Sequence, residues 1–333
     1  MSKQPVNLTL QACLELFIDR CERENLSSAT IQFYLYNIGS FIRYLLDEHN
    51  SENPPVVEFK ADNIHKYLKR VKERCKWEGH PNIKVHKGKV GGQSVRTYTR
   101  ALRTFGNWLF SEGLIEENIL KLVKLPKAAN ADKEVLTDAE IDTVMDSFNI
   151  RTELGLRNAI IFTLAYDCGI RMGGIANLLV KDVDLRLKTV RIRLKGGDIT
   201  VLPIGDLLTR QIREYIIKYR GLGKDEEPLI VNVRGGKLTE NAIKKMFSKL
   251  KGTTGIKRIH CHLGRHTFAT NYVMEGHSQH ELQLALAHQS DTASKKYIHL
   301  AERVTHARRG ADSHFDKMQE LDKDLKRTIA KVR

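Results

Sequence analysis

The sequence has no long apolar run and few cysteines, and each of these absences excludes a class of protein. No stretch approaches the roughly 18 consecutive apolar residues that a helix needs to span a bilayer. The polar start Met1–Asn7 lacks the apolar core of a secretory signal peptide. The five cysteines are odd in number, scattered and without a C-x-x-C pair, which is typical of a reducing cytosol and not of a disulfide framework. We therefore expect a cytoplasmic protein.

A metal site is also poorly supported by the sequence. His260, Cys261, His262 and His266 lie close together, but no acidic residue or C-x-x-C partner accompanies them. Neither the spacing of a zinc finger nor H-E-x-x-H is present. We therefore expect no metal and no other cofactor.

What the sequence has in excess is positive charge. Its 333 residues carry 55 lysines and arginines against 40 acidic residues, for a net charge of +15. This balance favours a polyanionic partner, either nucleic acid or an anionic membrane surface. Because no membrane-spanning run is present, nucleic acid is the better expectation. The chain is long enough for two domains of roughly 100–200 residues each.

The first part of the chain, residues 1–125, has the pattern of a small all-helical domain. Apolar residues recur at helical spacing in four segments. These segments are residues 8–24, about 28–46, about 62–76 and about 94–109.

Charge is unevenly placed within this first domain. Residues 1–59 have 4 basic and 8 acidic residues, whereas residues 60–103 have 13 basic and 3 acidic residues. The basic segment includes a glycine- and lysine-rich loop, Gly79–Gly92, with lysines at Lys84, Lys87 and Lys89. This loop is either an ordinary solvated face or a surface that contacts DNA phosphates, which supply affinity without sequence choice.

The second part of the chain begins after a predicted linker, residues 126–135, which lacks apolar periodicity. Thr137 and Glu140 then have the spacing of a capping box at a helix start. A mostly apolar helix is predicted over Arg157–Cys168, and Gly169 is suited to end it. Arg171 would follow directly, held by a rigid element and free to point outward.

A β-hairpin is predicted over Val190–Ile204, with its turn at Gly196-Gly197. Side chains alternate between the two faces of a strand. Arg191, Arg193 and Lys195 therefore share one face, opposite the apolar residues. Three cations beside a tight turn suit either a solvated face or a finger that reaches toward phosphates.

Further along, His262, Arg265 and His266 are spaced so that a helix places them on one side. Two imidazoles and a guanidinium make a poor core, but they suit an oxyanion. The planar fork of arginine matches phosphate geometry and stays charged at any working pH. These residues indicate a phosphate site.

The pattern His262-x-x-Arg265, a second histidine at His288 and a tyrosine nine residues later at Tyr297 resembles the tyrosine recombinase (phage integrase) family. That family carries another arginine after a helix and a lysine on a hairpin. Arg171 and Lys195 are the counterparts here, in the same order along the chain. The resemblance therefore covers about 130 residues.

The resemblance implies an enzyme that cuts and rejoins DNA through a 3′-phosphotyrosyl intermediate, without metal or cofactor. Its site residues would be Arg171, Lys195, His262, Arg265, His288 and Tyr297. Tyr297 would attack the phosphorus while Arg171, Arg265 and His288 hold the phosphate oxygens. Lys195 would protonate the leaving 5′-oxygen, and His262 would assist proton transfer from Tyr297.

The chain departs from the family pattern at three positions near these residues. Gly174 stands where an acidic residue is common, Gly264 where leucine is common, and Ala287 where glycine is common. The first of these removes an expected orienting carboxylate from the site.

Other interpretations stay open at this point. Tyr297 has the alternative of an ordinary packed tyrosine, His266 is better explained as a structural histidine, and Cys168 and Cys261 as small buried residues. Competing functions are a type IB topoisomerase-like activity and an architectural DNA-binding protein without catalysis.

The fold implied by the resemblance is mainly α-helical, with a small antiparallel β-sheet in the catalytic domain. It comprises a helical, SAM-like core-binding domain (1–125), a linker (126–135), a catalytic domain (136–300) and a carboxy-terminal tail (301–333), and the two domains form a clamp around DNA. The expected partners are double-stranded recombination sites of a mobile element or chromosome, bound in the nucleoid, and other copies of the chain in a tetramer on paired sites.

The tail has its own pattern. Apolar residues from Phe315 to Val332 recur every three or four positions, which predicts an amphipathic helix. Its apolar stripe would pack either on its own catalytic domain or, as the resemblance favours, on a neighbouring protomer.

Overall fold

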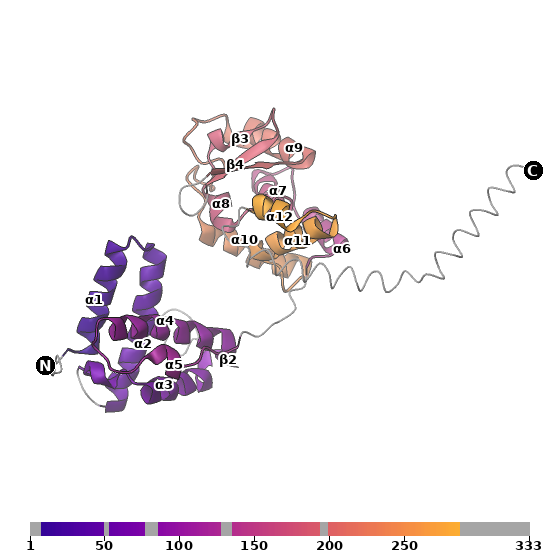
Figure 1. Cartoon of the computed structure of the whole chain (residues 1–333). Helices are drawn as coiled ribbons and strands as arrows, with labels where there is room; N and C mark the ends of the chain where they lie inside the picture. Colours follow the sequence, from indigo (N-terminus) through magenta and orange to yellow (C-terminus); the bar gives the residue numbers. More distant parts are fainter. Residues whose placement is uncertain (1–7, 50–52, 77–85, 128–134, 194–198, 287–333) are drawn as a thin grey trace, which may run out of the picture. The chain divides into compact units, whose positions relative to one another are not determined.

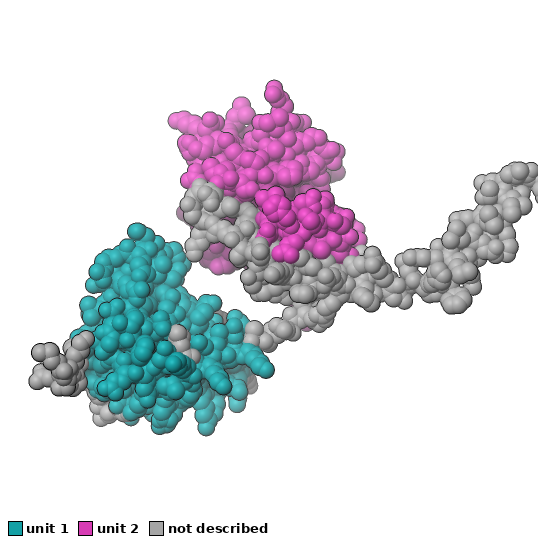
Figure 2. Space-filling view, viewed as in Figure 1, with its two compact units in different colours: residues 1–131 teal, residues 132–333 magenta. Residues whose placement is uncertain are grey.

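The computed structural model describes residues 8–49, 53–76, 86–127, 135–193 and 199–286. Contacts divide the chain into two compact units, Met1–Ala131 and Asp132–Arg333, shown in teal and magenta in Figure 2. Both units are mainly helical, and the second holds a three-stranded antiparallel sheet (Figure 1). This confirms the predicted fold class. None of the described helices is long and apolar enough to cross a membrane.

The first unit is a helical bundle around an aromatic core. Phe17 lies at its centre, 5.4 Å from the ring of Phe105 and 5.4 Å from that of Trp108, and such ring pairs stabilise a core beyond their buried area. The elements are α1 (Leu10–Arg23), α2 (Ser28–His49), η1 (Val56–Glu58), α3 (Ala61–Glu73), β1 (Cys75–Lys76), β2 (His86–Lys89), α4 (Gly92–Ser111) and α5 (Ile119–Leu122).

Part of the predicted glycine- and lysine-rich loop is a strand. Residues His86–Lys89 form β2, which pairs antiparallel with β1 directly after α3. The prediction of a loop over these residues was wrong. The strand forms through hydrogen bonds between backbone groups, which do not depend on a pattern of side chains. Its sequence, His-Lys-Gly-Lys, shows no alternation of apolar and polar residues. Lys84 lies outside the described residues, whereas Lys89 is exposed on β2.

The second unit surrounds one buried helix, α7. Ten of the fourteen residues of α7 are buried, because it is apolar on nearly all sides. It packs against α9 and α11. The elements are α6 (Asp138–Asp146), α7 (Glu153–Tyr166), α8 (Met172–Ala176), η2 (Val180–Asp182), β3 (Val183–Asp184), β4 (Thr189–Arg193), β5 (Ile199–Pro203), α9 (Asp206–Tyr215), the π-helix η3 (Ile216–Arg220), α10 (Glu240–Thr254), α11 (Cys261–Met274) and α12 (Gln279–Leu286).

The predicted hairpin is confirmed in β4 and β5, which pair from Thr189–Pro203 to Arg193–Ile199. Val190 and Ile192 are buried, while Arg191 and Arg193 are exposed, as the alternation predicted. The sheet has a third strand, β3, beside β4. With only two residues, β3 is too short to leave a periodic signal in the sequence.

Candidate active site

Arg265 lies at the centre of the candidate site and is only 3% exposed. It projects from α11, and its guanidinium donates to two backbone carbonyls. One bond goes to the Gly169 oxygen and the other, of 2.7 Å, to the Leu286 oxygen. A buried cation needs such partners, because an isolated charge in the interior is strongly unfavourable.

These two carbonyls belong to the segments that carry other predicted site residues. Gly169 lies two residues before Arg171, and Leu286 two residues before His288. Arg265 therefore joins three segments that are distant in sequence: the turn after α7, helix α11 and the end of α12. The sequence predicted that these segments act together, and the structure brings them into contact.

Position 169 requires glycine for two reasons, its backbone conformation and the close approach of neighbouring side chains. Its φ is +62°, and a Cβ added there would lie 2.5 Å from Cδ1 of Phe268 and 2.9 Å from Cδ2 of Leu286. Only glycine combines this left-handed conformation with so close an approach of α11 and α12. The predicted helix over Arg157–Cys168 corresponds to α7, which runs from Glu153 to Tyr166 with Asp167 as its C-cap. The prediction that Gly169 caps this helix was therefore wrong, because Gly169 lies in the turn that follows the cap.

Arg171 is the N-cap residue of α8 and is exposed. In the described part of the chain, no hydrogen bond or ion pair holds its guanidinium. Arg171 and Arg265 thus lie near the same turn but differ in environment. One is buried and bound to backbone, and the other is accessible to a ligand.

His262 and His266 lie one turn apart on α11, with ring centroids 4.8 Å apart and an edge-to-face arrangement. His262 is exposed, whereas His266 is 7% exposed. The helix therefore presents His262 for chemistry. The burial of His266 favours the structural role predicted for it.

Comparison with known proteins identifies the family. Residues 134–303 match the model of the phage integrase family. The chain belongs to the phage integrase family. It is 32% identical to the tyrosine recombinase XerC of Bacillus subtilis strain 168 over 280 residues, which cover 79% of this chain and 91% of the relative. Identity to the XerC of Bacillus pumilus is 29%, covering 88% and 93% of the two chains.

Solved structures share the fold. The Tn1549 transposon integrase in complex with transposon right-end DNA superposes with a TM-score of 0.68, at 16% identity over 90% of this chain and 99% of that one. The XerH recombinase bound to a palindromic difH substrate gives a TM-score of 0.66, at 18% identity over 92% and 85%.

The protein is therefore a tyrosine recombinase, a site-specific enzyme that cuts and rejoins DNA strands through a 3′-phosphotyrosyl intermediate. The matches support this function. They do not support the topoisomerase-like or the purely architectural alternative.

Among the predicted catalytic residues of the recombinase, the structure places Arg171, His262 and Arg265. Lys195, His288 and Tyr297 lie outside the described residues. In the described ranges, no three His, Cys, Asp or Glu side chains gather as a metal site requires. Burial raises the pKa of the Cys261 thiol to about 12 and also raises that of Cys168, so neither is suited to act as a nucleophile.

The glycines that depart from the family pattern fill tightly packed positions. A Cβ added at Gly174 would lie 2.9 Å from Cγ2 of Ile170, so a larger residue there would require the Ile170 side chain to shift. A Cβ at Gly264 would lie 3.3 Å from the Ala165 backbone, which shows how closely α11 approaches α7. Gly174 occupies the position where the family commonly has an acidic residue. Beside it, the Glu240 carboxylate lies 3.1 Å from the place that a Cβ of residue 173 would take.

One basic helix face, on α10, escaped the sequence reasoning. The α10 lysine face consists of exposed residues Lys244, Lys245, Lys249 and Lys251, opposite the buried Ile243 and Phe247. On α4, Arg100 and Arg103, which belong to the basic segment 60–103, line a hollow of about 270 Å³ together with Thr104, Asn107 and Leu125. Cations at helical spacing opposite an apolar stripe were the available signal.

The hairpin residues line a larger hollow in the second unit. Arg191 and Arg193 lie along a cavity of about 490 Å³ between α8 and β4, with Lys237 also in its wall. Arg191 donates to the Lys181 carbonyl, and Lys237 donates to the Asn177 side chain at 2.5 Å. These cations add positive charge beside the element that carries Arg171.

Proposed function

We propose that Tyr297 is the nucleophile of this recombinase and that Arg171 and Arg265 hold the scissile phosphate. The observation that carries the proposal is the hydrogen bonding of Arg265 to the carbonyls of Gly169 and Leu286. These bonds fix the segments that lead to Arg171 and His288 around a single buried cation.

In this mechanism the phenolic oxygen of Tyr297 attacks phosphorus, and the bond to the 5′-oxygen breaks. Charge gathers on the nonbridging oxygens, where Arg171, Arg265 and His288 donate hydrogen bonds. His262 accepts the tyrosine proton, and Lys195 donates a proton to the leaving 5′-oxygen. The reverse reaction with the 5′-hydroxyl of another strand restores the phosphodiester and releases the tyrosine.

DNA contact is proposed on both units. In the first unit the candidates are Lys84, Lys87 and Lys89, together with Arg100 and Arg103 of α4. In the second unit they are Arg191, Arg193 and the α10 lysine face. These cations would bind phosphates and supply affinity with little sequence preference.

We further propose that the two units close on a duplex as a clamp and that four copies of the chain assemble on paired sites. The sites would belong to a mobile element or to a chromosome. A DNA partner is supported by the similar structures, in which the XerH recombinase and the Tn1549 transposon integrase are bound to DNA.

The test is covalent capture. DNA duplexes that bind the protein are first selected from a random-sequence pool. A nick is then placed next to the cleavage position, so that cleavage releases a short fragment and the strand cannot be rejoined. The wild-type protein should form an SDS-stable adduct. Tyr297→Phe should bind the same duplex with similar affinity and form none. A matched control, Tyr219→Phe, changes a tyrosine whose hydroxyl donates to the Arg151 carbonyl, and it should still form the adduct. An adduct with Tyr297→Phe would contradict the assignment.

A further inference from the structure

We propose that Arg258 is a positioning residue of the active site, which ties the start of α11 to the capping box of α6 through Glu140. The proposal rests on the proposed function only in that His262 and Arg265, both on α11, are taken as catalytic. The Glu140–Arg258 pair touches neither DNA nor the reacting atoms in this proposal. It acts through the helix that carries them.

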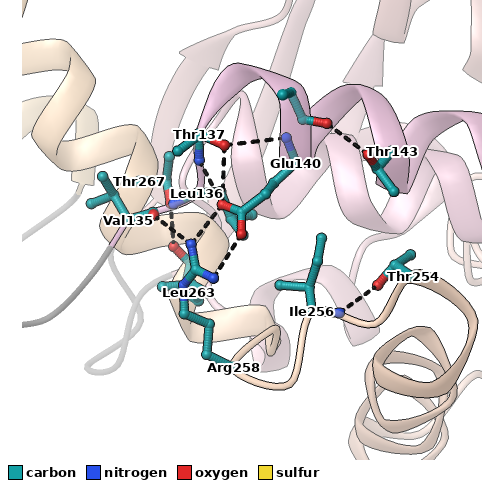
Figure 3. A network of polar contacts seen from close by, with 11 residues as sticks. Val135, Leu136, Thr137, Glu140, Thr143, Thr254, Ile256, Arg258, Leu263 and Thr267 are labelled. Carbon is teal, nitrogen blue, oxygen red and sulfur yellow. Dashed lines mark hydrogen bonds and ion pairs between the residues drawn. The ribbon is translucent and has the colours of Figure 1, made fainter.

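The pair is bidentate (Figure 3). Nη1 of Arg258 donates to Oε1 of Glu140 at 2.7 Å, and Nη2 donates to Oε2 at 2.6 Å. Nη2 also donates to the Val135 carbonyl at 3.1 Å. The two side chains are only 34% and 24% exposed, so solvent screens this pair less than the surface ion pairs of the protein. A fork-to-fork pair of this kind fixes orientation as well as distance.

Glu140 is itself held in place by the start of α6. The Thr137 N–H donates to Oε2 of Glu140 at 2.9 Å, and the Glu140 N–H donates to the Thr137 hydroxyl at 3.3 Å. This reciprocal pair is the capping box that the sequence predicted. The carboxylate therefore does not swing freely, and Arg258 binds a fixed partner.

The other side of the contact leads directly into the active-site helix. Nδ1 of His260, the N-cap residue of α11, lies 2.7 Å from the Arg258 carbonyl. His262 is the second residue of that helix. The position of the Arg258 backbone thus sets where the first turn of α11 begins.

A second bond holds α11 to the same segment. The Leu136 N–H donates to the buried Thr267 hydroxyl at 3.0 Å, and that hydroxyl donates to the Leu263 carbonyl at 2.9 Å. Residues 135–140 therefore contact Arg258, just before α11, and Thr267 within it. Both His262 and Arg265 lie between these two points.

The expected effect of losing the pair is on catalysis more than on binding. Without the pair, the start of α11 is held less firmly to α6, and His262 lies on its first turn. A misplacement of about 1 Å costs on the order of a hundredfold in rate. We expect a roughly tenfold to hundredfold slower cleavage at saturating DNA, with affinity for the same duplex little changed.

Three variants separate positioning from helix stability. Glu140→Gln keeps the capping box, since glutamine also serves at this position, but removes the charge. Arg258→Lys keeps the charge but removes the fork. Thr137→Ala weakens the cap and leaves both members of the pair. Glu214→Gln is the matched control, because it removes an exposed ion pair with Lys218 on a helix remote in sequence from α11.

Each variant of the full chain is tested on one nicked duplex. Adduct formation is timed at saturating DNA, the dissociation constant is measured separately, and amide-exchange protection of α7 reports stability. Glu140→Gln and Arg258→Lys should both slow adduct formation at unchanged dissociation constant. Thr137→Ala and Glu214→Gln should stay near the wild-type rate.

Two outcomes would overturn the proposal. One is an Arg258→Lys protein that cleaves at the wild-type rate. The other is a rate of adduct formation that falls in proportion to the amide-exchange protection of α7 across all four variants. That result would mean that the pair only stabilises the fold. Failure of the proposed function would look different, because the wild-type protein itself would then form no adduct.

Discussion

Arg171 and Arg265, the two arginines proposed to hold the phosphate, lie in opposite environments. Arg265 is buried and donates to the Gly169 and Leu286 carbonyls, so it contributes to the structure. Arg171 is exposed at the start of α8. Their substitution should therefore separate catalysis from stability.

Replacing either arginine with alanine should slow adduct formation by about 10²–10³-fold, the usual effect of losing one preorganised donor. Arg265→Ala should also destabilise the second unit by about 1.5–3 kcal/mol, because it leaves two inward-facing carbonyls without their charged donor. Arg171→Ala should change stability by less than about 0.5 kcal/mol, as exposed substitutions do. Both tryptophans, Trp77 and Trp108, lie in the first unit, so amide exchange of α7 is the appropriate measurement. Equal destabilisation by the two variants would contradict this division of roles.

At the scale of elements, α11 is held by contacts on several sides. Gly264 lets it approach α7, and Phe268 packs on Gly169. Arg258 attaches its start to Glu140 of α6, and Thr267 binds Leu136 just before α6. These contacts come from segments far apart in sequence. The geometry of the site thus depends on the packing of one helix.

The contact with α6 should depend on pH. The Arg258 guanidinium, followed by the N–H of Thr137, holds the pKa of the Glu140 carboxyl below its ordinary value of 4.5. Because the folded pKa is the lower one, the ionised carboxylate stabilises the fold above about pH 4.5, and this contribution is lost as pH falls through the folded pKa. Glu140→Gln should therefore be less stable than wild type at pH 7, and the difference should shrink below pH 4.5. Amide exchange of α6 and α11 measured across this range checks the direction; a difference that grows on acidification would contradict it.

The α10 lysine face predicts a salt-dependent contribution to DNA binding. Each phosphate contact that is lost should reduce the slope of log K against log salt by about 0.9. Replacing Lys244, Lys245 and Lys249 with alanine should therefore flatten the slope by up to about 2.7. The same substitutions at Lys84, Lys87 and Lys89 test the first unit separately. A slope that either triple variant leaves unchanged would place that group of lysines away from DNA.

At the scale of the whole molecule, the question is how copies of the recombinase assemble. The tail after Tyr297 lies outside the described residues, so its amphipathic pattern stays a prediction from the sequence. An apolar stripe from Phe315 to Val332 requires a partner surface. Docking on a neighbouring protomer would couple cleavage to the pairing of sites.

Truncation after Gly310 should then leave a folded protein that binds single sites. It should fail to assemble paired sites and lose strand exchange, because the stripe that joins protomers is gone. Light scattering of the DNA complexes, with and without the tail, measures the stoichiometry. Unchanged assembly of the truncated protein would instead mean that the tail packs on its own catalytic domain.

The sequence by itself determined those features that depend on local pattern. The period of apolar residues predicted the four long helices of the first unit and α7 of the second. The alternation in Val190–Ile204 predicted which side of β4 is buried. The capping box at Thr137 and Glu140 needs only the spacing of two residues. The order and spacing of Arg171, His262, Arg265, His288 and Tyr297 were sufficient to indicate the family.

Only the tertiary structure decided the contacts that place these residues. Arg265 and Gly169 are 96 residues apart, and Arg258 and Glu140 are 118 apart. The short strands β1 and β3 form through backbone pairing that leaves no side-chain pattern. The sequence singled out the glycines at 169 and 174, but it did not show that they pack against Phe268 and Ile170. Such contacts depend on which surfaces the packed helices bring together, and no local pattern in the chain encodes that.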